Sequence, residues 1–161
     1  MGMLNQLVSD YTEQLRQGKL QVAYKGILEY LSKLRNEFVK NYPDSEIGSN
    51  IYQGYMDMSY FSLNTKTLKA KGLKIALVYL HEKGAFEIWL SARNREIMKK
   101  YRTVFSDQVL DGISCFHDSD NEDAVLEYTL AAEPDFDNQF SLTEIIREGT
   151  EKFISVVTKM V

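Results

Sequence analysis

The chain has 161 residues, of which 44% are apolar and 26% are charged, and its formal net charge is −4. This composition excludes an intrinsically disordered chain, and the length predicts a single domain over residues 1–161 that buries a sizeable core. One cysteine and two histidines exclude a disulfide scaffold and a four-ligand zinc module.

The first 41 residues predict two helices. Apolar residues recur at helical spacing from Leu4 to Leu15, and Gly18 ends this first segment. A second apolar stripe runs from Leu20 to Val39 and stops before Pro43, which disfavours helical geometry in the residue ahead of it. We expect the two helices to form a hairpin that packs on a sheet.

The residues from 47 to 80 predict three strands. Residues 47–63 are rich in Tyr, Phe, Ser and Ile, which suits two strands around a tight turn at Gln53-Gly54. Residues 64–70 predict a short helix or turn. Residues 73–80 are apolar on both faces apart from Lys74, as in a central strand that is covered on each side.

A fourth strand follows the hairpin signal at residues 82–84. In this strand, residues 86, 88 and 90 are apolar and alternate with Glu87, Trp89 and Ser91, so one face belongs to the core and the other is mixed. Asn94 then suits the N-cap of a helix with an apolar inner face and a basic outer face, extending to Phe105.

The last third predicts further strand and a final helix. Residues 113–116 suit a short strand, and residues 124–131 fit helix and strand periods about equally; we favour a strand. Ser141-Leu142-Thr143-Glu144 has the pattern of a capping box that opens the final helix. The residues expected to face inward on that helix are Leu142, Ile145, Ile146, Phe153, Ile154, Val157 and Met160.

These elements predict an α+β fold. An N-terminal helical hairpin packs on a mainly antiparallel sheet of about 4–6 strands, with a helix after the fourth strand and a C-terminal helix.

The common catalytic signatures are absent from the sequence: it has no G-x-S-x-G, Walker A, H-E-x-x-H or G-x-G-x-x-G pattern. Cys115 lies two residues before His117, and a Cys-His pair can act as nucleophile and base. A partly buried structural cysteine explains the same residues more simply. No catalytic residue and no cofactor are therefore assigned.

The densest candidate site is the aromatic segment 52–61. We expect Gln53, Tyr55, Asp57, Trp89 and Arg93 to line one concavity that binds a small molecule or a protein partner. The plainer explanation is that Asp57 forms a structural ion pair with Arg93 or Lys74.

A metal-dependent hydrolase is the alternative function, with Asp57 and Glu87 on neighbouring strands as metal ligands. Nucleases of the restriction-enzyme type carry a lysine two residues after the second acid, and here that residue is Trp89. The sequence therefore favours a non-enzymatic binding or interaction module and assigns no metal.

Three motifs together resemble a family of small bacterial proteins defined as a domain of unknown function. They are Tyr52-Gln53-Gly54-Tyr55-Met56-Asp57-Met58-Ser59-Tyr60-Phe61, Phe86-Glu87-Ile88-Trp89-Leu90 with Asn94-Arg95, and Pro134-Asp135-Phe136-Asp137. The resemblance covers nearly the whole chain and implies a stand-alone cytoplasmic bacterial protein. It carries over no activity, cofactor or catalytic residue.

Charge is segregated along the chain and bears on partners. Residues 51–105 have a net charge of +6 and residues 106–161 a net charge of −10. A basic helix near Trp89 suits a nucleic-acid groove, but the low pI of 5.3 favours an ordinary solvated face, so we expect no nucleic-acid partner. The basic and acidic parts are expected to meet within one chain or across a homodimer.

No segment of the sequence is a candidate membrane span or secretory signal, so we expect a cytoplasmic protein without a membrane partner.

Overall fold

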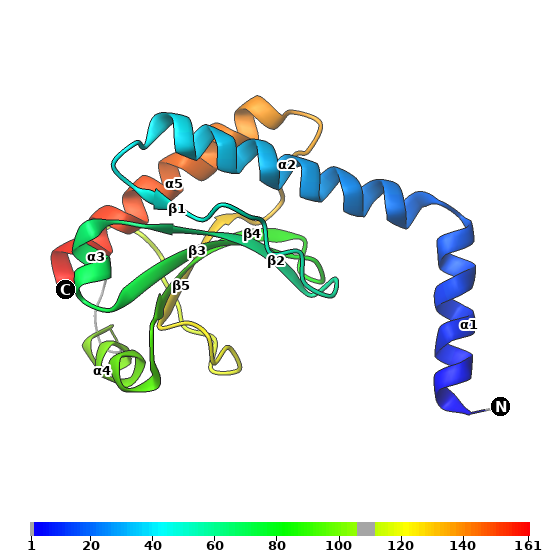
Figure 1. Cartoon of the computed structure of the whole chain (residues 1–161), viewed down its shortest axis with the longest axis horizontal. Helices are drawn as coiled ribbons and strands as arrows, with labels where there is room; N and C mark the ends of the chain where they lie inside the picture. Colours follow the sequence, from blue (N-terminus) through cyan, green and yellow to red (C-terminus); the bar gives the residue numbers. More distant parts are fainter. Residues whose placement is uncertain (1, 106–111) are drawn as a thin grey trace.

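The computed structural model describes residues 2–105 and 112–161, and a five-stranded antiparallel sheet lies at its centre (Figure 1). The elements, in chain order, are α1 (Met3–Arg16), α2 (Lys19–Asn41), β1 (Glu46–Ile47), β2 (Met58–Asn64), α3 (Lys66–Ala70), β3 (Leu73–Leu80), β4 (Ala85–Ala92), α4 (Arg95–Phe105), β5 (Leu126–Ala131) and α5 (Gln139–Met160).

The strands lie in the sheet in sequence order, and each is antiparallel to its neighbour. This order follows from short connections such as the turn at residues 82–84, which joins β3 and β4 in full register from Leu73↔Ala92 to Leu80↔Ala85. Residues 126–131 form a strand. The predicted α+β fold, with a helix after the fourth strand and a C-terminal helix, is confirmed.

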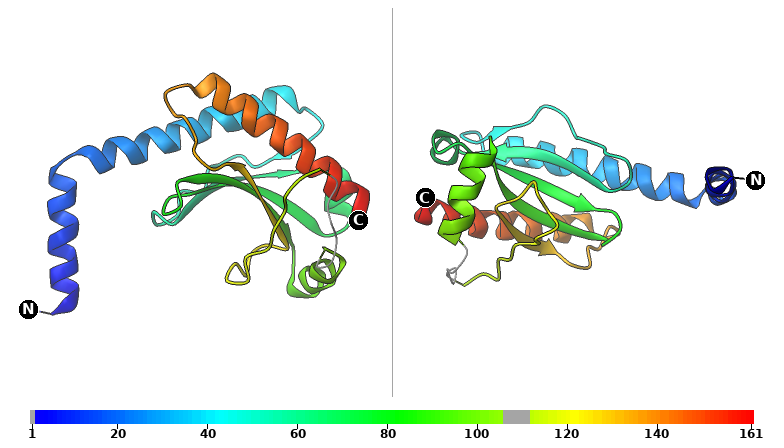
Figure 2. Two further views of the ribbon diagram at one scale, coloured as in Figure 1. Left: turned by 180° about the vertical axis from the view of Figure 1, so that it is seen from behind. Right: turned by 90° about the horizontal axis from the view of Figure 1, so that it is seen from below.

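The core lies between one face of the sheet and the helices α2 and α5, which cross that face (Figure 2). Alternate residues of each strand point to this side, among them Phe61 on β2 and Phe86 on β4, both fully buried. Phe38 of α2 packs edge-on against Phe61, with ring centroids 5.9 Å apart. Phe153 of α5 stacks with Tyr128 of β5. On the opposite face, no helix of the described part of the chain crosses the sheet as α2 and α5 do, and we call this face the open face.

The predicted helical hairpin is wrong in one respect, because α1 does not pack on the sheet. In Figures 1 and 2, α2 lies along the sheet while α1 turns away at a steep angle. No residue of α1 is buried. The turn is made by Gly18, whose φ of 78° is a left-handed conformation that glycine adopts at little cost. The amide of Gln21 also donates to the Leu15 carbonyl at 2.8 Å.

Helix α5 differs from the prediction at its start and in one inward residue. Asn138, and not Ser141, is the N-cap: its side-chain oxygen accepts the Ser141 N–H, and the helix begins at Gln139. Ile145 is 49% exposed, because its neighbour Ile146 occupies the core-facing direction and adjacent helix positions diverge by about 100°.

Arg102 links helix α4 to the loop before β5. Asn94 caps α4 through a bond from the Ile97 N–H, as predicted. Arg102, on the basic face of α4, donates to the backbone carbonyls of Glu122 and Ala124. Of the predicted strand at residues 113–116, Phe116 alone pairs, in an isolated bridge with Glu127.

Replacing Phe61 with alanine tests where the core lies. The buried ring fills space between α2 and the sheet, so Phe61→Ala should lower the free energy of unfolding by about 3–5 kcal/mol. The matched control is Phe140→Ala, because that ring is 81% exposed, and its effect should stay within about 0.5 kcal/mol. Urea unfolding followed by circular dichroism measures both, and equal losses would contradict the core assignment.

Candidate functional site

The five residues predicted to share one concavity lie in three separate places. Gln53, Tyr55 and Asp57 belong to the turn that precedes β2, next to the end of β3, where the His81 N–H donates to the Asp57 carbonyl at 3.0 Å. Arg93 follows β4 at the other end, where its N–H donates to the Gly72 carbonyl. The two ends are separated by about 24 Å, the length of an eight-residue strand. Trp89 lies between them on the open face.

Asp57 stabilises the turn and does not form the ion pair predicted with Arg93 or Lys74. Its carboxylate accepts the Tyr55 N–H at 2.9 Å, and backbone hydrogen bonds from Tyr55 and Met58 lower its pKa. Gly54 has a φ of 72°, and a Cβ at this position would lie 2.1 Å from the Met58 carbonyl oxygen. The turn therefore requires glycine at 54, and the acid at 57 satisfies the turn's own backbone.

A serine and a histidine lie beside this turn, but their hydrogen bonds do not suit nucleophilic catalysis. The Ser59 hydroxyl donates to the Gln53 carbonyl at 2.6 Å and lies 2.8 Å from His81 Nε2. Because the hydroxyl proton is directed to the carbonyl, the imidazole is the donor in the second bond and cannot accept the serine proton. Ser59 is also fully buried, so the pair anchors the turn.

The open face of the sheet holds a concavity of about 540 Å³. Side chains from β2, β3 and β4 form its floor and walls, and Tyr52 and Asp123 approach from the flanking loops. Its lining residues are Tyr52, Met58, Tyr60, Ser62, Lys74, Ile75, Ala76, Trp89, Ser91 and Asp123. The rings of Tyr52 and Tyr60 lie 4.8 Å apart and form one aromatic wall.

Trp89 forms part of the floor, and a buried acid holds its orientation. Its indole Nε1 donates to Glu87 Oε1 at 3.0 Å, and Lys83 Nζ lies 2.6 Å from Glu87 Oε2. Glu87 is 2% exposed, so its charge is stable there because both carboxylate oxygens have partners. Trp89 itself is only 7% exposed and packs with Val78 and Ala124, so it supports the sheet as well as lining the concavity.

A second buried acid on the open face, Glu127 of β5, binds the loop that precedes it. It is 1% exposed; Oε1 lies 2.8 Å from His117 Nδ1, and Oε2 accepts the Asp118 N–H at 2.9 Å. Sequence reasoning missed this residue because its segment was ambiguous between helix and strand. The available signal was a lone carboxylate inside the apolar run 124–130, which must have partners if the run is buried.

The loop before β5 forms the rim of the concavity on that side. The Ser91 hydroxyl donates to the Asp123 carbonyl at 2.5 Å, and Lys83 lies over the Phe116 ring at 5.3 Å. Cys115 lies in the same loop, and burial raises its pKa to about 12, so its thiol stays protonated at neutral pH. The packing of Cys115 against the core and the bond between His117 and Glu127 support a structural role for both residues.

The arrangement provides contact area and a few polar groups. The two acids predicted as metal ligands do not lie side by side, because Asp57 lies opposite His81 whereas Glu87 pairs with Val78. Both carboxylate oxygens of Glu87 also have donors already. Across residues 2–105 and 112–161, no group of three or more His, Cys, Asp or Glu side chains could hold a metal ion.

None of the helices in those ranges is both long enough and apolar enough to span a bilayer.

The chain belongs to the family described as "Domain of unknown function (DUF7000)", whose model matches residues 4–161. Searches of curated proteins and of solved structures find no significant match. The family therefore covers almost the whole chain, and the site must be interpreted from its own chemistry.

Removing the charge of Glu127 tests its role in holding the loop. Glu127→Gln leaves one acceptor oxygen where His117 Nδ1 and the Asp118 N–H both bind, and it removes the charge that strengthens both bonds, so the free energy of unfolding should fall by about 1–3 kcal/mol. Glu122→Gln is the control, because that side chain is exposed in the same loop. Chemical unfolding measures the difference, and equal stability of the two variants would show that Glu127 is not needed.

The pH dependence of stability tests the burial of His81. Burial lowers the pKa of His81 below its usual 6.5, while Asp57 acts weakly in the opposite direction. Below pH 6.5 the unfolded chain therefore binds the proton more readily, so the free energy of unfolding should fall as the pH drops from about 7 to 5. His81→Gln, whose amide can keep the bond to Ser59, should show a flatter dependence in urea unfolding; identical slopes would contradict the assignment.

Proposed function

We propose that this protein is a non-enzymatic binding module, and that the concavity on the open face holds a small ligand with a flat aromatic part and an anionic group. The observation that carries the proposal is the Trp89 indole, held by the buried Glu87 carboxylate at the floor of a concavity of about 540 Å³. Ligand sites are commonly concave and mostly apolar, with a few placed polar groups.

Rigid aromatic contacts support the proposal. The indole orientation is held by Glu87, and Tyr52 and Tyr60 pack ring against ring along β2. A ligand that stacks on groups already held in place loses less conformational entropy in binding. Aromatic rings also give a large contact area, which suits a planar ligand.

The charges at the rim support an anionic group on the ligand. Lys74 is the cation among the lining residues, and its side chain is exposed on the open face of β3 opposite Ser91. The Ser62 hydroxyl lies on the neighbouring strand, where it can donate a second hydrogen bond. Asp123 lines the concavity beyond Ser91, whose hydroxyl donates to the Asp123 carbonyl, and its carboxylate disfavours a second negative charge on the ligand.

The metal-dependent hydrolase has less support. Its two acids are not adjacent: Asp57 satisfies a turn, and the buried Glu87 is used by Lys83 and Trp89. A hard cation prefers several converging oxygens, and these two carboxylates do not converge. Among the described residues that line the concavity, no nucleophile is hydrogen-bonded to a base.

The single tryptophan of the chain is a built-in reporter for ligand binding. Titration with aromatic carboxylates, aromatic phosphates and matched neutral aromatic amides should give saturable changes in Trp89 fluorescence, with the anions favoured. Tyr60→Ala should weaken binding of anions and amides about tenfold, since a lost stacking ring costs roughly 1 kcal/mol or more. Lys74→Met should weaken the anions and leave the amides unchanged.

The control is Tyr55→Ala, because Tyr55 is 91% exposed and lies in the turn outside this concavity. It should bind like the unmodified protein. Trp89→Ala is unsuitable, since the buried indole also supports the sheet. A saturable response that survives Tyr60→Ala would place binding elsewhere, and the absence of a saturable response across the panel would count against the proposal.

A further inference from the structure

The apolar stripe of α1 is exposed along its length. Its residues, Leu4, Leu7, Val8, Tyr11 and Leu15, recur at helical spacing on one side, and the first four are at least 50% exposed. A lone 14-residue helix is marginal in water, because most helical stability comes from packing of an apolar face. The stripe therefore indicates a packing partner.

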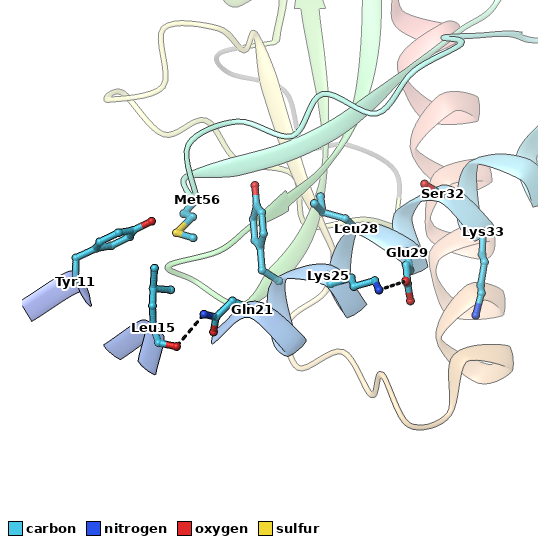
Figure 3. Close-up of a pocket in the computed structure, with 10 residues that line it drawn as sticks. Tyr11, Leu15, Gln21, Lys25, Leu28, Glu29, Ser32, Lys33 and Met56 are labelled. Atoms are coloured by element: carbon cyan, nitrogen blue, oxygen red, sulfur yellow. Dashed lines mark hydrogen bonds and ion pairs between the residues drawn. The ribbon is translucent and has the colours of Figure 1, made fainter. Parts of the chain in front are cut away.

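A groove of about 610 Å³ lies in the angle between α1 and α2 (Figure 3). Tyr11 and Leu15 border it from α1, Tyr24 and Leu28 from α2, and Met56 from the turn before β2. In Figure 3, Tyr11, Leu15 and Met56 point toward one another across the opening. The groove is mostly apolar, as is the stripe.

We propose that the partner is a second copy of this chain, and that the apolar stripe of each α1 packs along the groove of the other copy. The two surfaces are complementary and belong to the same chain, which is the requirement for a two-fold symmetric contact. The predicted helical hairpin is then completed between chains. This dimer does not depend on the ligand proposal, because the groove and the concavity share no lining residue.

Charge complementarity favours this arrangement. Helix α1 has two acidic residues, Asp10 and Glu13, and one basic residue, Arg16, so its net charge is negative. The groove is lined by two basic residues, Lys25 and Lys33, and one acidic residue, Glu29, so its net charge is positive. Lys25 is paired with Glu29 at a loose 3.9 Å on an exposed surface. An incoming α1 therefore brings negative charge to a positive rim.

The hydrogen bonds at the turn between α1 and α2 favour a second copy over closure of α1 on its own α2. The Leu15 carbonyl accepts the Gly18 N–H at 3.0 Å and the Gln21 amide at 2.8 Å. Folding α1 back would disrupt these bonds, whereas exchange between copies leaves them intact. In Figure 3 the bond from the Gln21 amide to the Leu15 carbonyl spans the turn between α1 and α2.

The area is sufficient for a specific contact. A 14-residue helix is about 21 Å long and 10 Å wide, and a symmetric exchange covers two such helices and the two surfaces that receive them. The total is on the order of 1,000 Å², which is the lower bound for a stable interface.

The first test is the mass of the full chain in solution, measured by light scattering after size exclusion. The 18.6 kDa chain should elute as a dimer. Val8→Asp should convert it to a monomer whose circular dichroism loses no more helix than the 14 residues of α1. Val39→Asp is the matched control, since Val39 is 46% exposed against 50% for Val8 and lies on α2 outside the groove, and it should remain dimeric. A monomeric unmodified protein, or a dimeric Val8→Asp variant, would overturn the proposal.

A cross-linking experiment identifies which surfaces meet. In a Cys115→Ala background, one preparation carries Leu7→Cys and the other Leu28→Cys, and a short bismaleimide is added after mixing. Linkage between the two different chains is the expected result. A chain that carries both changes, and that links only to itself as a monomer, would show closure on its own α2 and would overturn the exchange.

Discussion

The Glu87 carboxylate lies almost completely out of solvent on the open face of the sheet, between the Lys83 ammonium and the Trp89 indole N–H. A charge in that position is stable only while both partners remain in place. The turn after β3, which carries Lys83, and the middle of β4 are thereby held in a single arrangement. On the next strand, Glu127 does the same for the loop before β5. Glu87 thereby fixes the indole in the floor of the concavity, and Glu127 fixes the loop that carries Asp123 to its rim.

The two faces of the sheet are stabilised by different physics. On one side, α2 and α5 cover alternating apolar residues, and the favourable term is removal of apolar surface from water. On the other side, the apolar cluster is small, and buried polar groups that satisfy one another hold the structure. A face of this second kind can leave a hollow open, because its contacts are directional and local. The aromatic wall of Tyr52 and Tyr60 borders that hollow.

The same contrast separates the two proposals. The ligand site depends on side chains that hydrogen bonds already orient, so binding there requires little rearrangement. The α1 surface has no such support inside one chain. Its apolar stripe and the neighbouring groove are both exposed, and a second copy covers both at once. On helix α4, by contrast, Arg102 already binds backbone carbonyls of the loop before β5 within the same chain.

Local patterns in the sequence were sufficient for most of the elements. Period-two alternation in β4 correctly separated Phe86, Ile88 and Leu90 from Glu87, Trp89 and Ser91, because each strand residue reverses the direction of the side chain. Asn94 correctly marked the start of α4, since capping depends on residues only a few positions apart. These are short-range effects, and the antiparallel meander follows from them because short turns join neighbouring strands.

Tertiary structure alone decided which side chains meet. Asp57 and Arg93 appeared compatible with one site, but strand register places them at opposite ends of the sheet, and register is a long-range property. The partners of Glu127 lie in a loop whose path no local pattern specifies. Likewise, periodicity identified the apolar face of α1, but the direction of that face depends on the backbone at Gly18, which periodicity does not encode.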